Sequence, residues 1–316
     1  MARCLSGAMS IIKMNNFQKK SLIAIVILLI LVIFWVKPSQ ERIPKELSEH
    51  KIIDDDYLDF ISRNLAGGGP SKDGIPSIDN PQYVSVLEAD KFLDDNSIVY
   101  GVDYNGFVAA YPQKIMYWHE IVNDEINGEK ISVTYCPLTG STIGYKNKNL
   151  GVSGKLYNSN LVMYDRETDS LIPQIIGVAI DGSLKGQKLE SFHVFQTKWI
   201  DWKAKHPNTK VLSLETGNDR NYDKNPYPGY DDILRLWFPV ATESNQFKTK
   251  ELMIGIELNN NYYSIPKNQI KEFSVEQINF SIDKKLNTLV ADKPVKYFDV
   301  YWFAWYAYHP NTKIIK

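Results

Sequence analysis

"WIDWKAKHPNTKVL", residues 199–212, recurs near the end of the chain as "WFAWYAYHPNTKII", residues 302–315. The two segments share two tryptophans, an alanine and the run His-Pro-Asn-Thr-Lys at the same spacing. The tryptophans lie three residues apart and therefore fall on one face of a helix, which the proline ends. An Asn-Thr turn and an apolar pair follow. Each copy thus predicts a helix, a turn and a short strand, with the tryptophans packed in the core.

Each copy also places a histidine, His206 or His309, directly after the predicted helix. An imidazole at the C-terminal end of a helix can bond to the last carbonyl groups. We therefore expect a structural role for both histidines, rather than metal binding or catalysis.

A looser echo lies upstream of each copy. Residues 99–112, "VYGVDYNGFVAAYP", correspond to residues 253–266, "MIGIELNNNYYSIP", and both read as strand, turn, strand and proline. In the first of them, Asn105–Gly106 suits the tight type I′ turn of a hairpin. The pattern predicts a β-rich α+β domain of short antiparallel strands and short helices. It consists of two related, unequal units, a first unit at about 95–214 and a second unit at about 250–316.

The longer first unit carries three motifs that the second unit lacks. They are "YWHEIVND" at residues 117–124, "VTYCPLTG" at 133–140 and "NSNLVMYDRETD" at 158–169. Features that both units share are expected to be scaffold. The chemistry of the protein is therefore sought in these three motifs.

One motif places Cys136 at the end of a strand-like run and directly before Pro137. A nucleophile on a strained turn uses the N–H of the next residue as an oxyanion donor, and proline has no N–H. A zinc knuckle of the C-P-x-C-G type needs a second cysteine where this chain has Thr139. Neither kind of site is expected here.

Three alternatives remain open for Cys136. A mixed metal site would combine it with His119 and Met163, and copper would suit these soft ligands best among the metals. A thiolate of low pKa would be stabilised by the backbone N–H groups of the following turn. The third alternative is a buried, inert thiol that only fills space.

Polar residues near the cysteine motif complete the predicted site. His119 and Glu120 follow an apolar aromatic run, and Asp165 and Arg166 follow "NLVMY". Asp165 and Arg166 read either as an anion clamp or as a surface ion pair. We predict that His119, Cys136 and Asp165 or Arg166 converge on one cavity. In it, His119 would be ligand or base, Cys136 ligand or nucleophile, and Glu120 a further catalytic candidate.

The N-terminal part contains "LIAIVILLILVIFWV", an apolar run flanked by lysines. It is slightly shorter than the roughly 20 residues of a transmembrane helix, but flanking lysines can reach the membrane surface. "KPSQERIP" offers no cleavage site for a signal peptidase, so we predict an uncleaved anchor at residues 21–37. Basic residues in the tail, residues 1–20, predict that the N-terminus lies on the cytoplasmic side of the cell membrane. A linker and loop at 38–74 and a domain at 75–316 would then lie outside.

The expected partner of this topology is the lipid bilayer. The net charge of the chain is −1, which gives no reason to expect nucleic acid as a partner. Protein partners stay open. The topology also separates Cys4 from Cys136, so no disulfide between them is expected.

The chain resembles a known family in several long motifs that occur in the same order. They include "DGIPSIDNP", "AYPQKIMYWHEIVND", "VTYCPLTG", "GVSGKLYNSNLVMYDRETDSL" and "WFAWYAYHP". The resemblance is to the bacterial and archaeal domain of unknown function 3179, over roughly residues 70–316. It implies a family but no reaction or cofactor. Members commonly resemble C-P-L-C-G at the cysteine loop, where this chain has Thr139, so a paired-thiol role is disfavoured.

Two functional hypotheses follow from the sequence. The first is a small-molecule, thiol or metal site around Cys136 and His119 in a membrane-anchored extracytoplasmic protein. The second is a non-catalytic surface or complex-assembly module, in which the same motifs only stabilise the fold.

Overall fold

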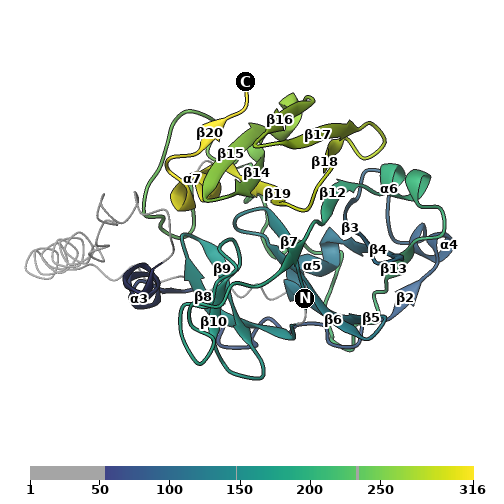
Figure 1. Ribbon diagram of the computed structural model, residues 1–316. Coiled ribbons are helices and arrows are strands. Elements are labelled where there is room, and N and C mark those ends of the chain that lie inside the picture. The colour runs from purple at the N-terminus through teal and green to yellow at the C-terminus, as the bar shows by residue number, and fades with distance from the viewer. Residues whose placement is uncertain (1–53, 147, 233–234) are drawn as a thin grey trace, which may run out of the picture. The chain divides into compact units, whose positions relative to one another are not determined.

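The computed structural model describes residues 54–316, apart from residues 147 and 233–234. The predicted anchor at 21–37 and the tail before it lie outside the described residues. Within the described part, no helix is both long and apolar enough to cross a membrane. The β-rich fold with few helices that the sequence predicts is confirmed (Figure 1).

Helices in the described part are short. They are α3 (Asp55–Arg63), α4 (Val86–Ala89), α5 (Gln113–His119), α6 (Trp199–Lys205), α7 (Trp302–Tyr308) and the 3-10 helix η1 (Lys267–Gln269). The first helix begins at Asp54, whose carboxylate accepts the N–H of Tyr57. Such a cap satisfies one of the N–H groups that a helix start leaves unpaired.

The strands of the described residues form five small sheets. Two belong to the middle of the chain: β1 (Ala66–Gly67), β8 (Leu150–Tyr157), β9 (Asn160–Asp165) and β10 (Leu171–Pro173) in one, and β11 (Ser191–Phe192), β7 (Ser141–Lys146), β6 (Glu129–Cys136) and β5 (Ile121–Ile126) in the other. The first-unit sheet has the order β12 (Phe195–Lys198), β3 (Ile98–Tyr104), β4 (Phe107–Pro112), β13 (Lys210–Leu212) and β2 (Tyr83–Val84). The second-unit sheet has the order β19 (Lys296–Tyr301), β14 (Leu252–Leu258), β15 (Asn261–Pro266) and β20 (Lys313–Ile314). The last sheet contains β16 (Phe273–Val275), β17 (Ile278–Asp283) and β18 (Thr288–Ala291).

The four strands β12, β3, β4 and β13 of the first-unit sheet have the same topology and the same register as the four strands of the second-unit sheet, and β2 is an addition to the first. In each, a central hairpin is flanked by an antiparallel strand on one side and a parallel strand on the other. Lys210 pairs with Ala109 in the first sheet, and Lys313 pairs with Tyr263 at the corresponding position of the second. The register therefore follows the correspondence that the sequence repeat predicts, residue by residue.

The tryptophans of the repeat explain two glycines. A Cβ atom at Gly101 would lie 2.2 Å from the ring of Trp202, and one at Gly255 would lie 2.3 Å from the ring of Trp305. Both rings are fully buried and each packs directly on the backbone of the hairpin. Each copy therefore needs a glycine opposite its second tryptophan.

The shared threonine of the repeat has a role as well. The indole Nε1–H of Trp202 donates to Thr209 Oγ1 at 3.0 Å, and that of Trp305 donates to Thr312 Oγ1 at 2.8 Å. A buried indole N–H normally finds such a partner. The turn after each helix is thus tied to the tryptophan inside it.

A long segment joins the two units. Residues 213–251, called the strap here, run from the end of β13 to the start of β14. Its described residues contain no helix and no strand. Loops of this length without secondary structure are uncommon in compact domains and are often functional.

Candidate functional site

His119 is the last residue of α5, and its ring is fully buried. Nδ1 lies 2.7 Å from the carbonyl oxygen of Pro76, and Nε2 lies 2.7 Å from the hydroxyl of Tyr222. Burial lowers the pKa of His119, which favours the neutral ring. Because a carbonyl can only accept, Nδ1–H donates to Pro76 and Nε2 accepts from Tyr222. Both ring nitrogens of His119 are therefore engaged in hydrogen bonds within the protein.

Glu120 follows in the left-handed backbone conformation, with φ 55°, and turns the chain from α5 into β5. Such a conformation is uncommon for a residue with a side chain and stores strain. The buried carboxyl accepts the hydroxyl of Tyr227 at 3.1 Å. Burial raises the pKa of Glu120 to about 7. This residue is a buried acid that can change its protonation near neutral pH.

Cys136 ends β6 and is 1% exposed. Its Sγ accepts the N–H of Leu161 at 3.3 Å. Burial, and secondly the charge of Glu120, raise the pKa of Cys136 to about 11. A reactive thiolate needs the opposite shift. The geometry thus favours the inert thiol among the three alternatives that the sequence leaves open.

The cysteine loop rests on a buried polar network. Its members are fully buried side chains from the loop, from β6, β7 and β9 and from the residue after β10: Thr134, Thr139, Ser141, Asn160 and Gln174. Asn160 Nδ2 donates to Thr139 Oγ1 at 3.0 Å and to Gln174 Oε1 at 2.9 Å. Gln174 Nε2 donates to Thr134 Oγ1 at 2.9 Å. A satisfied network of this kind rigidifies its surroundings.

The other predicted site residues lie in different hydrogen-bonded groups. The Asp165 carboxylate accepts the Thr168 hydroxyl at 2.9 Å and pairs with Lys148 at 3.3 Å. Arg166 pairs instead with Asp79 at 2.9 Å. Asp165 ends β9 and Arg166 begins the turn that follows, and the two side chains pair with different partners.

The hydrogen bonds and ion pairs of His119, Cys136, Asp165 and Arg166 thus do not join these residues in one group, and their convergence on one cavity stays a prediction. Of the candidates, Glu120 is the one whose charge acts on the Cys136 thiol. The copper site of Cys136, His119 and Met163 is not assembled either, since both nitrogens of His119 have other partners. Across residues 54–316, as far as they are described, no group of three or more His, Cys, Asp or Glu side chains is placed to hold a metal ion.

Tyrosines of the strap cover the buried region around His119, Glu120 and the cysteine loop. Sequence reasoning missed these tyrosines. The hydroxyl of Tyr222 is hydrogen-bonded to His119, and that of Tyr227 to Glu120. The hydroxyl of Tyr230 donates to the backbone carbonyl of Leu138 at 3.0 Å. The tyrosine-rich run "NYDKNPYPGY" at residues 221–230 was the available signal. Its three tyrosines stand among polar residues, prolines and a glycine.

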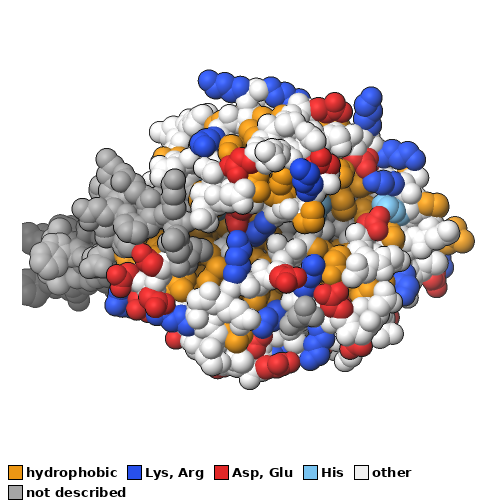
Figure 2. All heavy atoms as spheres, in the orientation of Figure 1, with side chains coloured by type: hydrophobic (Ala, Val, Ile, Leu, Met, Phe, Trp, Pro, Cys, Tyr) orange, Lys and Arg blue, Asp and Glu red, His pale blue; other side chains and the backbone are white. Residues whose placement is uncertain are grey.

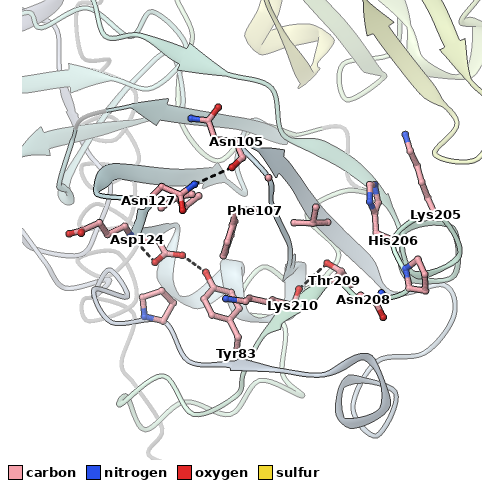
Figure 3. Close-up of a pocket in the computed structure, with 16 residues that line it drawn as sticks. Tyr83, Asn105, Phe107, Asp124, Asn127, Lys205, His206, Asn208, Thr209 and Lys210 are labelled. Atoms are coloured by element: carbon pink, nitrogen blue, oxygen red, sulfur yellow. Dashed lines mark hydrogen bonds between the residues drawn. The ribbon is translucent and has the colours of Figure 1, made fainter.

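The first unit also has an open groove of about 830 Å³ (Figure 3). One wall comes from the β3–β4 and β5–β6 turns, and the other from the turn between α6 and β13. Figure 3 shows Phe107 between the two walls, with Tyr83 and Lys210 along one side. The polar lining residues on which the interpretation depends are Asn105, Asp124, Asn127, His206 and Asn208.

Several contacts organise the groove. The hydroxyl of Tyr83 donates to Asp124 Oδ2 at 2.5 Å. The Lys210 ammonium lies 5.2 Å from the ring centroid of Phe107 and 5.8 Å from that of Tyr83. The ring of His206 packs on Trp202, with 4.2 Å between centroids. Burial lowers the pKa of His206, so the imidazole is neutral at pH 7 and presents one donor and one acceptor.

In the second unit, an aromatic side chain covers the histidine that corresponds to His206. The position of Val108 in the first unit is taken by Tyr262 in the second. The ring of Tyr262 stacks on His309 with 3.8 Å between centroids, and His309 is only 7% exposed. In the first unit Val108 lines the groove, and His206 is only partly buried. The sequence repeat itself contains this signal, as a difference between Val108 and Tyr262 at corresponding positions.

Comparison with known proteins gives a family and nothing closer. The model of the family described as "Protein of unknown function (DUF3179)" matches residues 72–293. No curated protein matches the chain, and no solved structure matches it.

Proposed function

The chain belongs to the DUF3179 family of proteins of unknown function, and we propose that it is a non-catalytic binding module. Its ligand occupies the groove of the first unit. The single observation that carries the proposal is the contrast between the two units. Tyr262 stacks on His309 in one copy, whereas the corresponding His206 lines an open groove in the other.

The volume of the groove supports this proposal. About 830 Å³ lies within the range of roughly 300–1,000 Å³ that is typical of small-molecule sites. The lining combines two aromatic rings with amide, carboxyl, amine and imidazole groups. These groups come from four turns or strand ends that belong to two different sheets. Binding sites are typically built in this way, on loops that a rigid scaffold positions.

The predicted topology belongs to the same proposal. An anchor at residues 21–37 would hold the domain outside the cell membrane as a single-pass protein, with its N-terminus inside. A module in that position would meet ligands of the cell surface or envelope. The bilayer would be its partner through the anchor.

A second candidate is a small-molecule or thiol site at Cys136, and one observation favours it. Glu120, with a pKa of about 7, acts on the Cys136 thiol and lies under the strap. Opening of the strap would expose both groups to a ligand. The raised pKa of the thiol is the argument against this candidate.

The proposal is tested by placing a tyrosine at position 108, where the second unit has Tyr262. In Val108→Tyr, the new ring is expected to stack on His206 as Tyr262 stacks on His309. A library of small polar compounds is screened against the full-length protein by saturation-transfer NMR. We expect binders of the wild type to bind at least about tenfold more weakly to the variant, a loss of about 1.4 kcal/mol.

The matched control is Tyr262→Val, which opens the other copy and leaves the groove intact. Thermal unfolding of both variants shows whether the fold is kept. Binders that are lost in Val108→Tyr and retained in Tyr262→Val support the groove. Binders that are indifferent to Val108→Tyr, or a screen without any binder, contradict the proposed function.

A further inference from the structure

The chemistry of the groove indicates what kind of ligand it accepts. We propose that the ligand is a neutral polyhydroxyl molecule, namely a short oligosaccharide chain; this inference rests on the proposed function. Three properties of the lining carry it: the balance of charge, the bifunctional polar groups and the aromatic rings.

The charges of the lining cancel. Asp124 and Glu125 stand against Lys205 and Lys210. Two of these charges are also engaged within the protein, because Lys205 pairs with Asp283 and Asp124 accepts from Tyr83. Figure 2 shows the same mixture of acidic and basic side chains over the visible face of the molecule. A site for phosphate or nucleic acid would need a field of one sign.

The remaining polar groups both donate and accept hydrogen bonds. The side-chain amides of Asn105, Asn127 and Asn208 offer an N–H donor and a carbonyl acceptor each, as does the neutral imidazole of His206. Asn127 Nδ2 donates to the backbone carbonyl of Asn105 at 3.2 Å, and this bond orients the side-chain amide of Asn127 at the rim of the groove. A sugar hydroxyl is also both donor and acceptor. Such a lining matches hydroxyl groups better than it matches ions.

Two rings give the groove an apolar surface between these polar walls. Phe107 and Tyr83 meet edge to face, with 5.8 Å between centroids and an interplanar angle of 75°. The face of an aromatic ring is negative and attracts polarised C–H groups. A sugar ring presents C–H groups on its faces and hydroxyls around its edge. The volume of the groove, near the upper end of the usual range, favours a short chain over a single sugar.

Calorimetric titration of the full-length protein tests this inference. The probes are the neutral trisaccharides maltotriose, cellotriose and triacetylchitotriose, with trialanine and inorganic phosphate for comparison. We expect at least one trisaccharide to bind with a Kd below about 1 mM, the usual range of weak specific ligands. Val108→Tyr should abolish this binding, and Tyr262→Val should retain it. Phe107→Leu keeps an apolar side chain without a ring and should weaken binding about tenfold.

The outcomes separate the ligand class from the proposed function. If trialanine or phosphate binds with the same dependence on Val108 and the sugars do not, the ligand class is wrong while the groove still binds. If none of these probes binds but the polar compounds of the NMR screen do, the ligand class is again wrong. If neither set responds to Val108→Tyr, both proposals fail.

Discussion

Lys296→Met is expected to cost about 3–5 kcal/mol of stability, because it leaves the Glu257 carboxylate without its ammonium partner. His309 Nε2 lies 3.7 Å from the same carboxylate, but burial lowers the pKa of His309 and so disfavours a compensating positive charge. Lys296 Nζ lies 2.9 Å from Glu257 Oε1, and the two side chains are only 9% and 11% exposed. The ammonium also donates to the carbonyl groups of Ile175 and Ile176. It therefore joins the second unit to the residues after β10. Burial alone would raise the pKa of Glu257, but the Lys296 charge holds it at about 2.

Urea unfolding at pH 7 measures this effect. Lys284→Met removes an exposed lysine of the same unit and should change stability by less than about 0.5 kcal/mol. The double variant Lys296→Met with Glu257→Leu removes both charges. It should recover much of the loss, since replacing a whole buried pair is often close to neutral. A loss below about 1 kcal/mol in the single variant would show that the pair is solvated in the native protein.

Glu120→Gln is expected to stabilise the protein at pH 8 and to have little effect at pH 4. Burial raises the pKa of Glu120 from its usual 4.5 to about 7. The folded state therefore holds a proton that the unfolded state has released between these values. The contribution of Glu120 to stability is fully present below pH 4.5 and is lost as the pH rises through 7. The shift corresponds to about 3 kcal/mol.

The ionisable groups around Glu120 do not change their protonation in the pH range of this measurement. Tyr227 and Cys136 face its carboxyl, and their raised pKa values keep both protonated at pH 8. Free energies of unfolding of variant and wild type are compared at several pH values, so that the contributions of all other groups cancel. Glu272→Gln, at an exposed position, serves as the control. A difference between Glu120→Gln and wild type that stays constant from pH 4 to pH 8 would rule out a buried acid.

The scaffold could be predicted because its signals are local. Asn105–Gly106 has positive φ at both residues, as the predicted tight turn requires. The Trp-x-x-Trp and His-Pro-Asn-Thr-Lys signals appear as α6 and α7, each followed by a turn and a short strand. The strand register then follows, because each buried tryptophan must meet a glycine of the hairpin. Both units repeat these constraints, which strengthens the prediction.

The candidate site could not be predicted in the same way. His119 is held by Tyr222 and Glu120 by Tyr227, more than one hundred residues further along the chain. The strap has no helical or strand period that would place these tyrosines in advance. The sequence therefore predicts one cavity for the three motifs of the first unit, whereas in the structure each motif has its own hydrogen-bond or ion-pair partners. The groove depends on a residue difference between repeats, at Val108 and Tyr262, and on turns that only the fold brings together.

Hydrogen–deuterium exchange of the full-length protein with the strongest binder from the compound screen tests most directly whether the groove is the functional site. We expect slower exchange in peptides that cover residues 105–109 and 206–210, with no change at the cysteine loop. Protection confined to residues 136–140 and to the strap tyrosines at 222–230 would contradict the groove. Such protection would instead place the binding site in the buried region around Glu120 and Cys136.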